Sequence, residues 1–191
     1  LVDFILTSIS DHTDKTFFQG IRKLAGGHNL IYDLSRDCFT IERYYEIRRR
    51  TELESVGPEE AAEIYREVLE DAVKVRLRAD VAVGTCLSGG LDSSSVASLA
   101  AVHYHAGSGR AFSAITAVSE QKSNDESSFA KLVVESGGME WLQVKPSYED
   151  FLGSLDAVVR AQEEPFGGPS LTMQYFVMKT ARENGIPVLL D

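Results

Sequence analysis

The sequence contains little cysteine. Only Cys38 and Cys86 occur among its 191 residues, and they are too far apart to form a CxxC motif or a common zinc-binding pattern. Each stands beside apolar residues. We therefore expect two reduced thiols in or near the hydrophobic core, where free cysteines are usually found.

Long apolar runs are absent as well. The sequence has no stretch of about eighteen apolar residues, the length needed to cross a bilayer. The first residues, LVDFILTSISDHTDK, lack the basic start and the cleavage site of a signal peptide. These absences predict a cytoplasmic protein without a membrane partner.

Basic residues are outnumbered. The chain has 19 Lys and Arg against 29 Asp and Glu, a formal net charge of -10, which argues against a general nucleic-acid binder because such proteins neutralise phosphates. A polyanion such as ATP would have to be bound by local groups. With 43% hydrophobic residues, the chain can nevertheless bury a sizeable core, as one domain or one domain plus a fragment.

From residue 58 onward, helical periodicity alternates with short apolar runs. The run Val81–Leu87 is apolar almost throughout, as in a strand buried on both faces of a parallel sheet. The alternation predicts an α/β domain with right-handed crossovers and helices on both faces of its sheet. We expect helices over 58–78, 94–105, 126–136, 148–162 and 171–184, and strands over 81–87, 111–117, 139–144 and 186–190.

The first 47 residues have a different pattern. Strand-like runs at 17–21, 28–33 and 38–41 are separated by glycines and polar turns, which is typical of antiparallel hairpins. So short a segment rarely folds alone. We interpret residues 1–50 as the tail of a larger domain with a linker, and residues 51–191 as the α/β domain, which stops where a ligand loop should begin.

The segment Leu87–Ser95, LSGGLDSSS, follows the first predicted strand of that domain. A loop between a strand and a helix exposes unpaired N–H groups, and Gly89 and Gly90 would let an anion approach them. Ser88, Ser93 and Ser94 add hydroxyls, whereas Asp92 suits a phosphate only with Mg²⁺ between them. No Lys stands where a Walker loop requires one. The structural alternative is a helix capped by Asp92 or Ser93.

SGGLDSS resembles the pyrophosphate loop of the ATP-pyrophosphatase superfamily. Residues 16–28, TFFQGIRKLAGGH, resemble the stretch that closes the glutaminase domain of glutamine-hydrolysing asparagine synthetases, and further matches follow in the family's order. These further matches are Arg43-Tyr44-Tyr45, Asp125-Glu126, Glu164-Pro165-Phe166, Pro169-Ser170 and Ile186–Leu190. Departures are Ala25-Gly26 for Pro-Pro, Tyr45 for Trp, Cys86 for Leu and Asp191 for Ser.

The resemblance implies a parallel-sheet fold like that of the adenine-nucleotide alpha-hydrolases, preceded by a β-rich remnant of an Ntn-type glutaminase domain. It implies that aspartate attacks the α-phosphate of ATP, that pyrophosphate leaves, and that glutamine-derived ammonia displaces AMP. Asp92 would bind Mg²⁺ and act in catalysis together with Glu164, and the family allows a homodimer. The nucleotide-binding residues would be Cys86, Leu87, Ser88, Gly89, Gly90, Leu91, Asp92, Ser93, Ser94, Ala114, Ile115 and Asp191.

Several alternatives stay open. A β-lactam synthetase or a lasso-peptide cyclase would use the same adenylation with another amine. A tRNA-modifying adenylase and an inactive nucleotide-binding module are more distant options. Glu164 is equally well read as an exposed acid at a helix end. Ser123–Glu126 and Ser147–Asp150 have the pattern of helix-capping boxes, and His103 and His105 would point to different faces of one helix.

Overall fold

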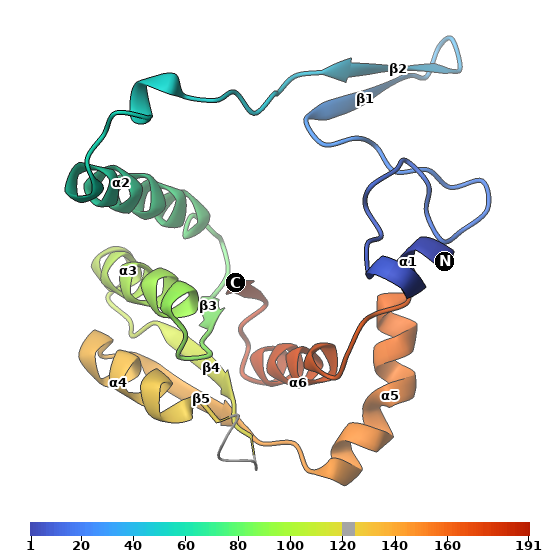
Figure 1. Ribbon diagram of the computed structural model, residues 1–191. Helices are drawn as coiled ribbons and strands as arrows, with labels where there is room; N and C mark the ends of the chain where they lie inside the picture. The colour runs from blue at the N-terminus through green and yellow to red at the C-terminus, as the bar shows by residue number, and fades with distance from the viewer. Residues whose placement is uncertain (120–124) are drawn as a thin grey trace. The chain divides into compact units, whose positions relative to one another are not determined.

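The structure of the chain is a computed structural model that describes residues 1–119 and 125–191 (Figure 1). The chain divides into two compact units, Leu1–Val56 and Gly57–Asp191. Residues 51–56 lie with the first unit. No helix in the described ranges is long and apolar enough to cross a membrane.

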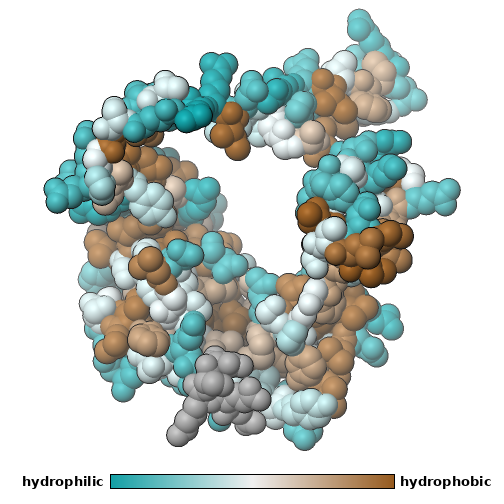
Figure 2. Space-filling view, in the orientation of Figure 1, coloured by the Kyte–Doolittle hydropathy of each residue, from teal (hydrophilic) through white to brown (hydrophobic). Residues whose placement is uncertain are grey.

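The first unit contains one antiparallel hairpin, β1 (His28–Asp33) and β2 (Cys38–Arg43), with Leu30 opposite Ile41. A helix, α1 (Val2–Thr7), and a 3-10 turn, η1 (Thr51–Leu53), complete its elements. Helix α1 was not predicted. Its side chains Val2, Ile5 and Leu6 are exposed, and Figure 2 shows a hydrophobic patch over this helix.

Two expectations for this unit were wrong. The run at 17–21 is not a strand, because only an isolated bridge between Lys15 and Arg22 flanks it. Cys38 is exposed instead of lying in a core, because every residue of β2 is exposed and a two-stranded hairpin has too few neighbours to bury its side chains.

The second unit is built on a four-stranded parallel sheet in the order β5-β4-β3-β6. Its strands are β3 (Val83–Cys86), β4 (Ser113–Ala117), β5 (Glu140–Val144) and β6 (Val188–Leu190). Its helices are α2 (Pro58–Arg76), α3 (Leu91–Ser108), α4 (Ser127–Gly137), α5 (Tyr148–Gln162) and α6 (Ser170–Glu183). The predicted α/β fold with a parallel sheet is confirmed.

Local signals explain the helix ends. Pro58 occupies the first turn of α2 beside Glu59 and Glu60, and Lys74 and Arg76 occupy the last, as the helix dipole favours. For α5, the predicted capping box forms: Ser147 Oγ accepts from the N–H of Asp150 at 3.1 Å, and Asp150 Oδ2 accepts from the N–H of Ser147 at 2.9 Å.

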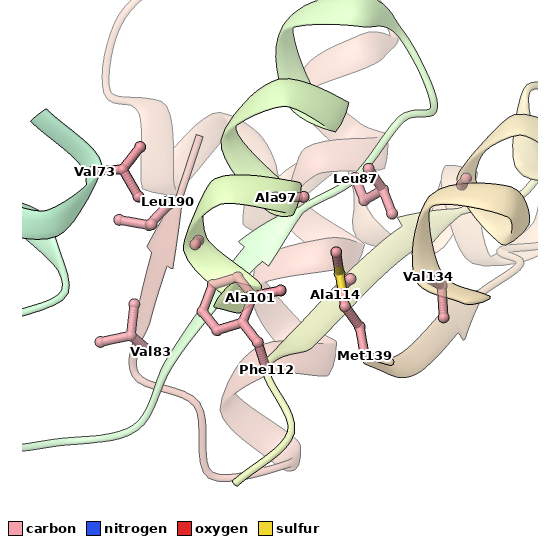
Figure 3. Packing of buried hydrophobic residues seen from close by; sticks show 12 residues of the cluster. Val73, Val83, Leu87, Ala97, Ala101, Phe112, Ala114, Val134, Met139 and Leu190 are labelled. Atoms are coloured by element: carbon pink, nitrogen blue, oxygen red, sulfur yellow. The ribbon is translucent and has the colours of Figure 1, made fainter. Parts of the chain in front are cut away.

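Each face of the sheet carries its own hydrophobic core. On one face, α2, α3 and α4 pack over side chains that include Val83, Phe112 and Ala114 (Figure 3). On the other face, α6 packs Val177 against Ile115, and Figure 1 shows α6 across the sheet from α3 and α4. Because side chains alternate along a strand, neighbouring residues of β4 serve different cores.

Candidate functional site

The serine- and glycine-rich loop connects β3 to α3. Helix α3 begins at Leu91, three residues earlier than predicted, and its N-cap is Gly90 without a side-chain cap bond. Asp92 and Ser93 therefore lie inside the first turn, so the interpretation that one of them caps the helix is wrong. Neither side chain caps the helix, so both can interact with other groups.

The loop is shaped by its own hydroxyl groups. Ser93 Oγ lies 2.9 Å from Ser88 Oγ and accepts from the N–H of Ser88 at 3.3 Å. The N–H of Gly90 donates to Ser88 Oγ at 3.2 Å, and the N–H of Leu87 donates to the carbonyl of Ile115 at 2.9 Å. These bonds position the turn at the carboxyl ends of β3 and β4, where parallel sheets bind ligands.

Gly89 has a backbone φ of 94°, a conformation that residues with a side chain rarely adopt. A Cβ at this position would lie 2.7 Å from the carbonyl oxygen of Glu126 and 2.9 Å from the amide nitrogen of Ala130. The loop thus packs directly against the start of α4, and residue 89 has no room for a side chain.

Ser94 carries a buried polar atom. Its Oγ has no hydrogen-bond partner among the described residues, although its backbone N–H donates to the carbonyl of Gly90 at 3.0 Å. Leaving a buried hydroxyl unpaired costs about 1–3 kcal/mol. The N–H groups at the start of α3, in the same turn, are the donors of this loop that suit a nucleotide's phosphates.

A pocket of about 430 Å³ adjoins the loop. The strand ends β3, β4 and β6 form one wall and the first turns of α6 form the other. The lining residues are Cys86, Leu87, Ser88, Ile115, Ala117, Ser170, Leu171, Gln174, Val177 and Asp191. The pocket is thus predominantly apolar, with a few polar groups from different elements, as small-molecule sites usually are.

Five predicted site residues, Cys86, Leu87, Ser88, Ile115 and Asp191, line this pocket. Sequence reasoning missed Ala117 and the four residues of α6. Positions 170, 171, 174 and 177 recur with helical spacing, which is a signal for a common face. The spacing alone does not distinguish a helix face that lines a ligand pocket from one that packs in the core.

The other predicted residues are placed differently. Ala114 is fully buried beneath α3, on the opposite face of β4 from Ile115. Leu91 is 84% exposed at the start of α3. Glu164 is partly buried in the α5–α6 connection and is not one of the residues that line the pocket. The structure thus brings Glu164 into neither the pocket nor the loop.

One corner of the pocket holds a carboxylate with two neighbouring polar groups. Gln174 Nε2 donates to Asp191 Oδ2 at 3.5 Å. Burial, followed by the negative charge of Asp191 and a hydrogen bond with it, raises the pKa of the Cys86 thiol to about 11. The thiol therefore stays protonated near neutral pH.

A metal ion would have few protein ligands here. Among the described residues, no three His, Cys, Asp or Glu side chains are grouped as a metal site. Asp92 is exposed beside the loop. One carboxylate is enough for a Mg²⁺ ion that takes its other oxygens from phosphates and water, so Asp92 suits a nucleotide-bound magnesium ion and not a separate protein metal centre.

Other candidate side chains have structural partners. Both carboxylate oxygens of Asp125 accept from Ser127, at 3.2 Å from its N–H and 2.9 Å from its hydroxyl. Those bonds hold the pKa of Asp125 below its usual value. The expected capping box at 123–126 begins outside the described residues, and Glu126 makes no side-chain cap bond. His103 Nε2 lies 2.9 Å from Glu70 Oε1, which joins α3 to α2.

Comparisons with known proteins show what this chain is similar to. Asparagine synthetase [glutamine-hydrolyzing] 1 of Bacillus subtilis is 31% identical over 62% of this chain and 18% of its own length. Amidase chyE of Penicillium rubens is 41% identical over 46% of this chain and 13% of its own. The structure of the NH3-dependent NAD synthetase from Campylobacter jejuni aligns with 65% of this chain and 53% of its own, at 18% identity and a TM-score of 0.43.

The chain spans 26% of the length of the Mycobacterium tuberculosis relative that it matches at 28% identity. The family model described as asparagine synthase matches residues 65–191, which include the loop, the pocket and every strand of the parallel sheet. This chain therefore belongs to the asparagine synthase family.

Proposed function

We propose that the protein containing this chain is an ATP-dependent, asparagine synthetase-like amidotransferase. It adenylates the side-chain carboxylate of aspartate and then forms an amide with ammonia derived from glutamine. The observation that supports this proposal best is the position of the loop, whose hydroxyls and N–H groups adjoin an apolar pocket of about 430 Å³ at the carboxyl ends of the strands.

The loop provides the groups for the phosphates. N–H groups at the start of α3 and the hydroxyls of Ser88, Ser93 and Ser94 would surround the pyrophosphate portion of ATP. Asp92 would hold Mg²⁺, which offsets negative charge on the phosphates when it is bound. The adenosine would lie in the pocket between the apolar side chains of β3 and β4 and those of α6.

In this reaction the aspartate carboxylate attacks the α-phosphorus of ATP. The bond from that phosphorus to its bridging oxygen breaks, and the electron pair leaves with pyrophosphate. Ammonia then attacks the acyl carbon and releases AMP. The loop acts by holding the departing pyrophosphate with donors that are already oriented, which is mainly positioning and electrostatic stabilisation. A catalytic role of Glu164 rests only on the resemblance of Glu164-Pro165-Phe166 to the family's motif, because this residue does not line the pocket.

The ammonia requires a glutaminase. The hairpin of the first unit, with apolar side chains exposed on both strands, suits a strand pair from a larger sheet. We therefore keep the proposal that this unit is the tail of an Ntn-type glutaminase domain.

A second candidate is amide formation on an acid other than aspartate. The loop and the pocket would bind the nucleotide and do not specify the acid. A relative that is 41% identical over 91 residues is named amidase chyE and not asparagine synthetase, which favours keeping a second acid as a candidate. A β-lactam synthetase or lasso-peptide cyclase would belong to this group.

The test uses the full-length protein with ATP, Mg²⁺, aspartate and glutamine. We expect AMP, pyrophosphate and asparagine in equal amounts, measured by chromatography of the nucleotides and amino acids. Release of ADP would reject adenylation. Formation of AMP only with a different carboxylic acid would reject the aspartate assignment and support the second candidate.

Replacing Asp92 tests the magnesium assignment. Asp92→Asn keeps the shape of the side chain but removes its charge, and we expect turnover at saturating ATP to fall about 100-fold, as when one transition-state contact is lost. The comparison is Asp80→Asn, an exposed acid that precedes β3 at the other end of the strand, which should leave turnover intact. Equal rates in Asp92→Asn and the unchanged protein would mean that Asp92 is only a surface residue of α3.

A further inference from the structure

A second cavity, of about 530 Å³, lies at the amino ends of the strands. Residues 77–82, which connect α2 to β3, form one side of it, and the last turns of α3 with Arg110 form the other. Because β3 and β4 are neighbouring parallel strands, the connections that precede them meet at this end of the sheet. This amino-end cavity is therefore at the opposite end of β3 from the serine-rich loop.

The inner wall of the amino-end cavity is apolar. Leu77 and Tyr104 pack against the hydrophobic core of this face, and the ring of Tyr104 lies 5.2 Å from that of Phe112, so this wall is held in place. Gly107 leaves space beside it, because a Cβ there would meet nothing within 4 Å. A wall of this kind suits the apolar body of a small molecule.

Two arginines stand at the rim. Arg78 follows the C-cap of α2 and Arg110 follows that of α3. Within the described part of the chain, neither guanidinium has an ion-pair or hydrogen-bond partner, although Asp80 lines the same cavity. The helix dipole favours a positive charge after a helix, but it leaves the N–H groups of each guanidinium unused. Those N–H groups form a planar fork that matches a carboxylate or a phosphate.

The surroundings limit the charge of the anion that would bind there. Asp80 adds a negative charge to the lining, and the C-terminal ends of α2 and α3 add partial negative charge. Both oppose a doubly charged phosphate more than a singly charged carboxylate, since like charges disfavour one another. The apolar wall requires the remainder of the ligand to be uncharged. One carboxylate on an apolar body meets both conditions.

We propose that the amino-end cavity binds a small monocarboxylic acid with an apolar body, whose carboxylate accepts hydrogen bonds from Arg78 and Arg110. The acid bound there is not the acid that reacts, because the serine-rich loop lies at the other end of the sheet. This inference goes beyond the proposed function and does not depend on ATP consumption.

The experiment is a ligand-observed NMR titration of the full-length protein with 4-methylpentanoate. Its uncharged counterpart 4-methylpentanamide and inorganic phosphate are titrated in parallel. We expect the acid to bind about 10-fold more tightly than the amide, the lower limit for hydrogen bonds to charged groups, because both arginines are exposed. Phosphate should bind more weakly than the acid. Saturating Mg-ATP should leave the affinity for the acid unchanged, because the two sites are separate.

Replacing the arginines tests the role of charge. Arg78→Gln and Arg110→Gln should each weaken binding of the acid about threefold, as expected for an exposed charge pair, and leave binding of the amide unchanged. The double variant should bind acid and amide equally. Arg66→Gln is the matched control, because Arg66 is exposed on α2 and does not line the cavity. It should keep the full preference for the acid.

Filling the cavity tests its location without removing a charge. Gly107→Leu introduces a side chain into the open space in the last turn of α3 and should prevent binding of both acid and amide. The helix is kept, because leucine favours helix more than glycine does. Gly153→Leu is the control: Gly153 lies in α5 with equally open surroundings, and its replacement should leave both affinities unchanged.

Four results would overturn the inference. They are equal affinities for acid and amide in the unchanged protein, an unchanged preference in the double arginine variant, tighter binding of phosphate than of the acid, and displacement of the acid by Mg-ATP. The last result would place the acid beside the serine-rich loop. Loss of acid binding in Gly107→Leu together with full binding in Gly153→Leu would support the inference, whether or not the protein forms AMP.

Discussion

Two adjacent glycines in the loop make opposite steric demands. Gly89 has a φ of 94° and would place a Cβ against the backbone of α4, whereas a Cβ at Gly90 would meet only Ser88 Oγ at 3.4 Å, an ordinary contact. The sequence motif contains both glycines, but their neighbours differ. Gly89 is required because the loop packs on α4 at this position. Gly90 is the N-cap of α3 and leaves that helix end without a side-chain cap.

Alanine substitutions separate these roles. We expect Gly89→Ala to lower the free energy of unfolding by about 1–3 kcal/mol from backbone strain alone, and to weaken ATP binding because the loop must shift. Gly90→Ala should change stability by less than about 1 kcal/mol. Urea denaturation of both variants measures the difference. Equal stability of the two variants would contradict the contact between Gly89 and α4.

The two cysteines should differ in reactivity. The pKa of Cys86 is raised to about 11, so at pH 8 only about one thiol in a thousand is deprotonated, whereas Cys38 is exposed on β2. Iodoacetamide at pH 8 should modify Cys38 first, as mass spectrometry of peptides would show. Because folding raises this pKa from 9.0, the contribution of Cys86 to stability is complete below pH 9 and is lost as the pH rises through about 11. Preferential labelling of Cys86 at pH 8 would refute this assignment.

At the scale of single elements, helix α5 illustrates what local sequence can specify. Both reciprocal bonds of its capping box involve residues three apart, so a short sequence pattern was sufficient to predict them. The start of α3 was misjudged for the opposite reason. Serines and an aspartate usually cap helices, but the turn between β3 and α3 places Gly90 at the N-cap, so that Asp92 and Ser93 fall inside the first turn.

Removing the cap of α5 tests its contribution. Ser147→Ala leaves the N–H of Asp150 without its partner and should lower the free energy of unfolding by about 1 kcal/mol. Ser136→Ala is a suitable comparison, because its exposed hydroxyl donates only to a carbonyl of its own helix at 3.0 Å. Thermal unfolding followed by circular dichroism should show a lower midpoint for Ser147→Ala alone. A similar loss in both variants would show that the cap has no special role.

At the scale of the whole molecule, the chain consists of two units with different kinds of structure. The second unit has an all-parallel sheet with a hydrophobic core on each face. The first has a single hairpin whose strands are almost entirely exposed. Between β2 and α2, residues 44–55 are exposed and contain three consecutive arginines. Surface ion pairs such as Arg49–Glu54 at 2.7 Å add little rigidity.

Limited digestion with trypsin should therefore cut first at Arg48–Arg50. The expected product begins within residues 49–51 and extends through the α/β unit, because exposed connections without buried contacts are cleaved before packed helices. Mass spectrometry of the early products identifies the cut. Replacing the three arginines with glutamine should remove this cut without changing unfolding behaviour. Early cleavage inside α2 or α3 would contradict the division at Val56.

The sequence by itself determined the α/β class, the position of the phosphate-type loop and the order of its elements, because strand and helix periodicity and loop composition are local properties. It could not determine which face of a strand or helix meets the ligand. Ala114 and Ile115 are adjacent in the sequence, yet one lies beneath α3 and the other in the pocket. Gln174 became a candidate only when α6 was placed over the strand ends, beside Asp191. Side-chain direction relative to distant segments depends on how the layers pack, and only the tertiary structure decided it.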